Sequence, residues 1–233
     1  MKLSIIIPLY NEIKTIEELL KRINKVKMDK EIVIVDDFSK DGSREWLQNL
    51  NTKNIKKVFH DKNYGKGMAI RSGIKEATGD IIIIQDADLE YDPNDYPELV
   101  KPIVEGKAEV VYGSRILGNL MRNMKGKHTS AYYEYYMGGK ALTILTNILY
   151  NAKITDEPTC YKVFKSDVIK NLDLKCVRFE FCPEVTAKVR KKGHKIYEIP
   201  IKYNPRSLDE GKKIKIKDGF EAVWALLKYR FVN

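Results

Sequence analysis

Two aspartates, Asp86 and Asp88, lie two residues apart just past a run of four isoleucines, and Glu90 follows two residues later. Carboxylate oxygens are the ligands that Mg²⁺ and Mn²⁺ prefer, and these ions often share their coordination with substrate phosphates. A solvated acidic turn is the alternative, but the position after a hydrophobic run favours a metal site. We therefore predict that Asp86 and Asp88 bind Mg²⁺ or Mn²⁺, with Glu90 as a further ligand or as a hydrogen-bond partner of a ligand.

A second acidic pair, Asp36 and Asp37, follows the hydrophobic residues 32–35. A carboxylate in this position can accept hydrogen bonds from a ribose or from a base, and Asp37 is the better candidate. Turn formation is the alternative, because residues 41–43 (Asp, Gly, Ser) all favour turns. For residues 41–43 we prefer the turn, with Ser43 as the N-cap of the next helix.

The first hydrophobic segment, residues 3–7, also ends in polar residues. Pro8 is expected to end the strand, Tyr10 can stack on a base, and Glu12 can bind a ribose or a base. For Asn11 we prefer the structural interpretation, in which it caps the following helix.

Basic residues are the third group of candidates, because they can bind phosphate. Lys66 lies between two glycines before a predicted helix, whose free N–H groups attract anions. Arg115 follows a predicted strand. Arg206 and Lys212 belong to a basic loop, for which a solvated face is the alternative. We do not predict nucleic-acid binding, because aromatic residues do not alternate with these basic ones.

The elements that must position these residues alternate between short apolar runs and segments of helical spacing. Continuous apolar strands separated by helices indicate an α/β fold with a mostly parallel sheet covered on both faces. Such sheets bind ligands at the carboxyl ends of their strands, which is where the polar residues lie. The expected strands are residues 3–7, 32–35, 55–59, 81–84 and 109–112, with helices between them, the third from residue 68 to 77.

The second half of the chain is less regular. Residues 116–130 show no clean period and are expected to form a loop. We expect helices over residues 132–150, 184–191 and 218–229, strands over residues 161–164 and 196–203, and a basic loop over residues 204–217. Without a repeat or linker, residues 1–233 are interpreted as one domain, with a nucleotide- and metal-binding half at 1–115 and an acceptor-binding half at 116–233.

Composition narrows the class of protein further. The chain has 42 Lys and Arg against 32 Asp and Glu, a net charge of +10, which favours anionic partners. Its 3 cysteines form no CxxC pair, which disfavours a disulfide framework or a zinc site. Its 3 histidines are far apart in the sequence, and we interpret them as incidental. We expect neither a membrane span nor a signal peptide, because no apolar run is long enough and the chain starts directly with a strand.

Taken together and in order, these motifs resemble the family 2 inverting glycosyltransferases, which have the GT-A fold. The opening motif (residues 6–12), the second nucleotide-binding motif (35–43), the glycine segment (63–80) and the metal motif (86–90) all match. Residues 112–115, 156–161, 179–188 and 200–211 are most similar to the polyprenyl-phosphate sugar transferases, such as the dolichol-phosphate mannose synthases.

The resemblance implies a role for each candidate residue. The nucleotide would be held by Pro8, Tyr10, Glu12 and Asp37, and Ala87 would pack near the ribose. Asp86, Asp88 and Glu90 would surround the metal. Arg115 and Arg206, together with Lys212, would face the donor diphosphate or the acceptor phosphate. Asp156 is a candidate general base or acceptor-orienting group, with a turn residue before Glu157 and Pro158 as the alternative.

The implied function is transfer of a hexose from a nucleotide-diphosphate sugar to a polyprenyl or dolichyl monophosphate on the cytoplasmic face of a membrane. Transfer to a sugar hydroxyl and a non-catalytic nucleotide-sugar-binding subunit are the alternatives. The protein would bind peripherally to the membrane that carries its lipid acceptor, either directly or through a membrane-protein partner. In the closing helix, residues 220, 223, 224 and 227 form an apolar stripe that suits an interfacial helix, widened by residues 226, 229 and 231. The alternative is a helix packed on the core.

Overall fold

The computed structural model describes residues 1–121, 130–206 and 216–232 of the chain. Its elements alternate between strands and helices in the first half, as the apolar pattern predicts. In chain order they are β1 (Leu3–Leu9), α1 (Ile16–Lys25), β2 (Lys30–Asp36), α2 (Ser43–Asn49), β3 (Ile55–Phe59), α3 (Lys66–Glu76), β4 (Ile81–Ile84), η1 (Pro93–Asp95), α4 (Tyr96–Val104), β5 (Val110–Ser114), α5 (Arg115–Met121), α6 (Ser130–Tyr150), β6 (Lys162–Lys165), α7 (Ser166–Lys170), α8 (Phe181–Lys191), β7 (Ile196–Pro200) and α9 (Ile216–Phe231).

The strands form one sheet in the order β3-β2-β1-β4-β6-β5-β7. All neighbouring strands are parallel except β6, which is antiparallel to both β4 and β5. The parallel register of β1 and β2 pairs Leu9 with Asp36. The carboxyl ends of these strands therefore meet at one edge of the sheet, where the loops that carry the candidate residues begin.

Burial of both faces explains the continuous apolar runs. All four isoleucines of β4 are buried, and so are Ile5, Ile6 and Ile7 of β1. Helix α1 turns Ile16, Leu19, Leu20 and Ile23 toward this core. Helix α3 lies very close to β1, since a Cβ atom added at Gly73 would overlap the side chain of Ile6. A glycine at that position permits the close packing of α3 on the sheet.

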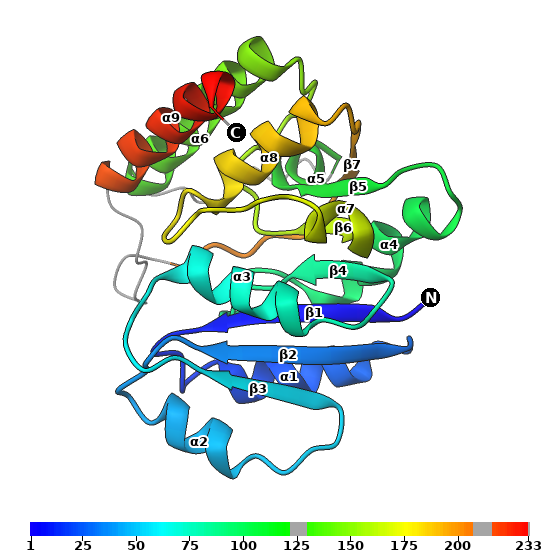
Figure 1. Cartoon of the computed structure of the whole chain (residues 1–233), viewed down its shortest axis with the longest axis vertical. Coiled ribbons are helices and arrows are strands. Elements are labelled where there is room, and N and C mark those ends of the chain that lie inside the picture. The colour runs from blue at the N-terminus through cyan, green and yellow to red at the C-terminus, as the bar shows by residue number, and fades with distance from the viewer. Residues whose placement is uncertain (122–129, 207–215, 233) are drawn as a thin grey trace.

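Three helices of the second half, α6, α8 and α9, lie together at the end of the molecule farthest from β3 and α2 (Figure 1). They share a separate small core made of Tyr150, Ala187, Ala225, Leu226 and Tyr229. Within the described ranges, the structure contains no helix long and apolar enough to cross a membrane.

Some details differ from the prediction. Strand β1 continues through Pro8 to Leu9. Gly42, with a φ of 97°, precedes α2, and Ser43 is the first residue of that helix instead of its cap. The Ser43 hydroxyl instead accepts a hydrogen bond from the Glu12 N–H at 3.0 Å. Residues Arg115–Met121 form α5, where we expected a loop, and residues 122–129 lie outside the described residues. Helices α4 and α7 and the turn η1 were not predicted.

Candidate active site

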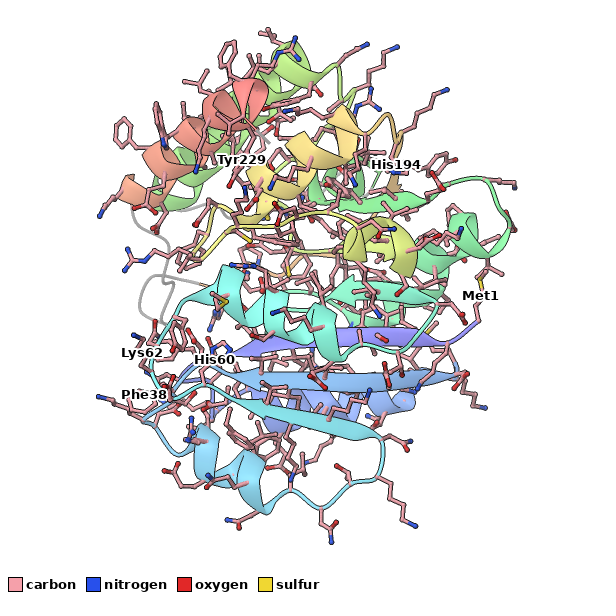
Figure 2. The ribbon with its side chains drawn as sticks, viewed as in Figure 1. Met1, Phe38, His60, Lys62, His194 and Tyr229 are labelled. Atoms are coloured by element: carbon pink, nitrogen blue, oxygen red, sulfur yellow. The ribbon has the colours of Figure 1, made fainter. Side chains whose placement is uncertain are left out.

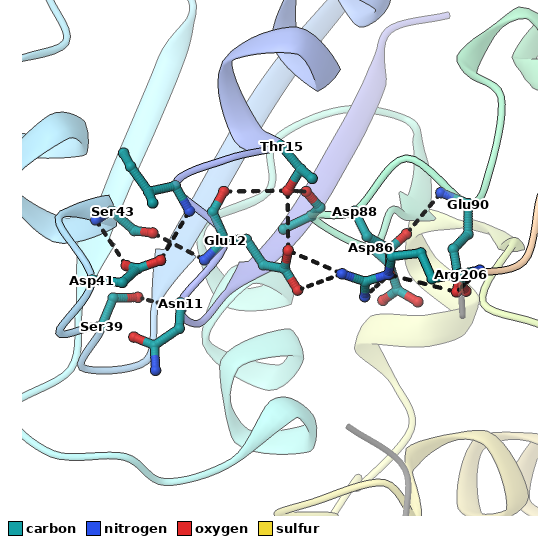
Figure 3. A network of polar contacts seen from close by, with 12 residues as sticks. Asn11, Glu12, Thr15, Ser39, Asp41, Ser43, Asp86, Asp88, Glu90 and Arg206 are labelled. Carbon is teal, nitrogen blue, oxygen red and sulfur yellow. Dashed lines mark hydrogen bonds and ion pairs between the residues drawn. The ribbon is translucent and has the colours of Figure 1, made fainter. Parts of the chain in front are cut away.

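The predicted acidic residues gather where β1 and β4 end side by side. Glu12 belongs to the loop after β1, while Asp86 and Asp88 belong to the loop after β4 (Figure 3). The Thr15 hydroxyl joins the two loops, since it lies 3.0 Å from Glu12 Oε2 and 2.9 Å from the carbonyl oxygen of Ala87. Residues far apart in the sequence thus form one acidic cluster, as the strand-end prediction required.

Arg206 lies in the middle of this acidic cluster (Figure 3). Its Nη2 is 2.7 Å from Asp88 Oδ2, and its Nη1 is 3.2 Å from both carboxylate oxygens of Glu12. Its backbone N–H donates to Glu90 Oε1 at 2.9 Å. The guanidinium, which we predicted to bind phosphate, therefore neutralises carboxylates in this arrangement. Lys212, the other predicted phosphate ligand of this loop, lies outside the described residues.

Lys66 is the second cation of the cluster. Its Nζ lies 2.5 Å from Asp86 Oδ1. Burial alone would lower the pKa of Lys66, but the carboxylate of Asp86 outweighs it and raises that pKa. Burial, reinforced by the charges of Asp86 and Glu90, raises the pKa of Asp88 to about 7 despite Arg206. The cluster therefore carries more negative charge than its two cations balance, and a further cation would be favoured there.

The donor set suits a divalent cation shared with a substrate. Carboxylate oxygens are hard ligands. Burial, together with the neighbouring charges of Asp86 and Glu90, raises the pKa of Asp88, and a bound cation would offset that negative charge. Within the described residues, however, no three Asp, Glu, His or Cys side chains are arranged to hold a metal ion. The three predicted ligands therefore do not converge: Glu90 turns toward the Arg206 backbone and accepts a hydrogen bond from the Tyr203 hydroxyl at 2.9 Å. Of the three predicted ligands, Asp86 and Asp88 remain the candidates for binding a cation.

A buried glutamine supports the loop after β4, which carries Asp86 and Asp88. Gln85 directly follows β4 and is fully buried. Its Oε1 accepts hydrogen bonds from the hydroxyls of Tyr96, at 2.6 Å, and Tyr161, at 2.8 Å. Its Nε2 donates to the carbonyl oxygen of Asp86 at 2.9 Å. The sequence analysis missed Gln85, although a polar residue directly after four isoleucines was a usable signal. A polar side chain there needs buried partners, which Tyr96 and Tyr161 provide.

Arg115 and the buried Asp156 form a bidentate ion pair next to the acidic cluster. Arg115 Nε and Nη2 each lie 2.8 Å from a different oxygen of Asp156, and the Arg115 backbone N–H adds a third contact at 2.9 Å. Although burial raises the pKa of Asp156, Arg115 outweighs that effect and lowers it. The guanidinium also lies over the ring of Tyr203, 5.0 Å from its centre. Arg115 is thus held in a fixed orientation, and Asp156 is a weak base.

Asp37 anchors the glycine loop that leads into α3. Its carboxylate accepts hydrogen bonds from the backbone N–H groups of Tyr64, at 2.9 Å, and Gly65, at 2.7 Å. Gly65 has a φ of 100°, and a side chain there would collide with the backbone of Val177. The glycine loop is therefore packed closely between Asp37 and the segment before α8. Lys66, the first residue of α3, reaches Asp86 from this loop.

The backbone is strained where the loops after β1 and β2 begin. Asn11 has a φ of 51° and Phe38 a φ of 66°, which L-residues rarely adopt. Such strain is common at binding sites, where the surrounding structure enforces it. Tyr10, predicted to stack on a base, is 37% exposed beside them. Pro8 lies within β1, opposite Val35 of β2.

The fold and the acidic site define the structural class. The structure is similar to that of glucosyl-3-phosphoglycerate synthase from Mycobacterium tuberculosis, which was solved in complex with Mn²⁺, UDP and phosphoglyceric acid. The TM-score is 0.72 at 16% identity, and the match covers 100% of this chain and 79% of that one. The fold is therefore of the GT-A type, as predicted.

Sequence comparison narrows this class to a family. The chain belongs to glycosyl transferase family 2, whose model matches residues 4–173. It is 30% identical to a dolichol-phosphate mannosyltransferase of Pyrococcus furiosus, over 98% of this chain and 64% of that protein. It is 31% identical to a UDP-N-acetylglucosamine–dolichyl-phosphate N-acetylglucosaminyltransferase of Methanococcus voltae, over 96% of this chain and 94% of that protein. The chain thus spans slightly less than two thirds of the first relative and nearly all of the second.

Proposed function

We propose that this protein transfers a hexose from a nucleoside-diphosphate sugar to a polyprenyl or dolichyl monophosphate. The observation that carries the proposal is the acidic cluster at the ends of β1 and β4, with Arg115 and Arg206 beside it. A site with carboxylates for a cation and guanidinium groups for phosphates suits two phosphorylated substrates. Both curated relatives have names that specify transfer to dolichyl phosphate, which supports this acceptor.

In the proposed reaction, an oxygen of the acceptor phosphate attacks the anomeric carbon of the sugar. The bond from that carbon to the nucleoside diphosphate breaks, and the diphosphate leaves with the bonding electrons, so the anomeric configuration inverts. A divalent cation at Asp86 and Asp88, Mg²⁺ or Mn²⁺, would offset the negative charge that develops on the leaving diphosphate. Solved structures of similar fold contain Mn²⁺ or Mg²⁺ together with UDP, which supports this choice.

Other residues of the chain would bind the nucleoside and the phosphates. Glu12 and Asp37, with Pro8, Tyr10 and Ala87, would bind the nucleoside. Arg115 would bind a phosphate, in an orientation that Asp156 fixes. An acceptor phosphate is already ionised at neutral pH, so it needs no general base. The lowered pKa of Asp156 fits this mechanism better than one in which Asp156 removes a proton.

Helix α9 supports a peripheral contact with the membrane that would carry the lipid. One apolar face, which includes Leu226 and Tyr229, is buried against α6 and α8. The other, which we call the outer α9 face, consists of Phe220, Val223, Trp224, Leu227 and Phe231, and all five side chains are exposed. The helix therefore packs on the small core with one face and exposes apolar and aromatic residues on the other, and this exposed face is compatible with the predicted interfacial role. We propose that the outer α9 face lies on the cytoplasmic surface of the membrane.

A transfer assay tests the proposed function. The protein is incubated with Mg²⁺ or Mn²⁺, a panel of UDP- and GDP-sugars and a short polyprenyl phosphate, and the lipid product is identified by mass. We expect one hexosyl-phosphoryl lipid, which is lost with a chelator and with the unphosphorylated polyprenol. A product formed only on a sugar hydroxyl would favour the alternative acceptor. Nucleotide binding without any transfer would indicate a non-catalytic subunit.

A further inference from the structure

His60, interpreted from the sequence as incidental, is part of a buried chain of hydrogen bonds next to the nucleotide-binding residues. It follows β3, and its Nδ1 lies 2.7 Å from Asp37 Oδ1. Its Nε2 lies 2.9 Å from the hydroxyl of Ser72 on α3. A neutral imidazole with its proton on Nδ1 donates to Asp37 and accepts from Ser72, which satisfies both ring nitrogens. His60 therefore helps to fix the Asp37 carboxylate, together with the N–H groups of the glycine loop.

The hydrogen bonds of Asp37 leave room for one further donor. An ionised carboxylate offers about four acceptor positions. Oδ1 takes hydrogen bonds from His60 and from the Tyr64 N–H, and Oδ2 takes one from the Gly65 N–H. Among the residues that the structure describes, these donors fill three positions, and the fourth is on Oδ2. A nucleoside can supply the missing donor as a base N–H or as a ribose hydroxyl.

We propose that His60 is a positioning residue for nucleoside binding, and that it holds Asp37 so that Oδ2 meets a nucleoside N–H or O–H. This inference rests on the proposed function, because it assumes a nucleoside-diphosphate donor. Figure 2 shows His60 on the same side of the molecule as Phe38 and Lys62, the side on which the strained loop after β2 lies. The ring also meets Tyr64 edge to face, with centres 5.2 Å apart, which restricts its rotation further.

The same chain of contacts reaches the metal-binding residues. His60 fixes Asp37, Asp37 fixes the N–H groups of Tyr64 and Gly65, and the next residue, Lys66, pairs with Asp86. Loss of His60 should therefore loosen the glycine loop as well as the nucleoside contact. A residue that only filled space would affect neither feature selectively.

Two substitutions at His60 test the proposal. His60→Ala removes the donor to Asp37, whereas His60→Asn retains an N–H close to the position of Nδ1. His194→Ala is the matched control, because His194 pairs with Glu109 and lies on the opposite side of the molecule (Figure 2). The dissociation constants of UDP and GDP are measured by calorimetry without acceptor. We expect His60→Ala to weaken the preferred nucleotide by about tenfold, and His60→Asn to restore most of the loss.

Deoxy nucleotides identify the donor group. If a ribose hydroxyl donates to Oδ2, the 2′- or 3′-deoxy nucleotide binds weakly to wild type, and His60→Ala reduces its affinity little further. If a base N–H donates to Oδ2, His60→Ala reduces the affinity of both deoxy nucleotides as much as that of the parent nucleotide. Either result supports the proposal. Equal dissociation constants for wild type and His60→Ala, within twofold, would overturn it.

Amide hydrogen exchange of the ligand-free protein separates this inference from the proposed function. We expect His60→Ala to accelerate exchange at Tyr64 and Gly65 by about tenfold, while the core strands β1 and β4 stay protected. If no nucleotide binds to the wild type, the proposed donor class is wrong, and the exchange result then decides the positioning role alone. Unchanged exchange at both amides would refute that role.

Discussion

At the scale of single residues, the negative charge of the acidic cluster is partly offset by cations that the protein itself provides. Arg206 contacts Asp88 and Glu12, and Lys66 contacts Asp86. A bound metal ion and two phosphates would change both pairings, because phosphates compete for the guanidinium and the ammonium. The same two cations can therefore neutralise carboxylates without substrate and contact phosphate with it. This dual use reconciles the observed ion pairs with the phosphate-binding role predicted for Arg206 and the nucleotide-binding role predicted for Lys66.

Asp88→Asn tests the metal-binding role. We expect the initial rate of transfer to fall by about 1,000-fold or more, because a carboxylate proposed to bind the cation is lost. The fold should persist, since asparagine has the same shape and the repulsion from Asp86 and Glu90 decreases. Circular dichroism checks the fold. Asp173→Asn, at a side chain that is 83% exposed, is the control and should keep the wild-type rate. Wild-type turnover of Asp88→Asn would show that the metal assignment is wrong.

Three of the residues that the sequence analysis singled out share one property: each follows a recognisable apolar strand. Asp37, Asp86 and Asp88 were found in this way, because parallel strands place their carboxyl ends together. His60 and Gln85 were missed because their partners are set by the lateral order of strands and by the packing of α3 and α4. Residue spacing in the sequence cannot predict such contacts between distant elements. The ion pair of Arg115 with Asp156 joins residues 41 positions apart and was equally hidden.

At the scale of elements, strands were easier to predict than helices of the second half. Buried strands leave continuous apolar runs, which are visible without knowledge of neighbours. Helix α4 was missed because it contains Pro102 in its interior, which normally argues against a helix. Helix α5 has only seven residues and packs against the end of β7, so it lacks a readable period. In both cases tertiary packing outweighs local preference.

One buried carboxylate, Glu31, joins β1, β2 and the segment between α3 and β4. It accepts hydrogen bonds from the Ser4 hydroxyl at 2.6 Å, the Thr78 hydroxyl at 2.7 Å and the Lys2 ammonium at 2.9 Å. Burial raises the pKa of Glu31, but these donors outweigh it and hold that pKa well below its usual range. A depressed pKa stabilises the fold above the unfolded-state pKa, and this stabilisation is lost as the pH falls.

Glu31→Gln tests this contribution. At pH 7 we expect the free energy of unfolding to fall by about 1–3 kcal/mol, because charge-assisted hydrogen bonds are lost. The difference from wild type should shrink as the pH is lowered below about 4, where wild-type Glu31 also loses its charge in the unfolded chain. Urea denaturation at a series of pH values measures both effects. Glu17→Gln, at an exposed residue of α1, is the control. A difference that does not depend on pH would contradict the electrostatic explanation.

At the scale of the whole molecule, the two ends of the sheet differ in what they present to solvent. The end with β3 and α2 lies far from the helical end, where α9 exposes its outer face (Figure 1). Trp224 is 66% exposed and Phe231 86% exposed. Lys217, Lys228 and Arg230 belong to the same helix. Aromatic and basic residues on one helix suit the boundary between anionic headgroups and acyl chains.

Binding to vesicles tests this surface. With a net charge of +10, the protein should bind anionic vesicles more tightly than neutral ones, by about 1 kcal/mol for each basic residue near the surface. Salt should weaken the preference for anionic vesicles.

Trp224→Ser tests the apolar part of the contact. It should weaken vesicle binding by about tenfold or more, because the side chain is no longer buried in the membrane interface. Tyr197→Ser, at a half-exposed residue of β7, should leave it unchanged. Sedimentation with vesicles measures the bound fraction. Equal binding to neutral and anionic vesicles would show that electrostatic attraction does not contribute to binding. Unchanged binding of Trp224→Ser would exclude the outer α9 face as the contact surface.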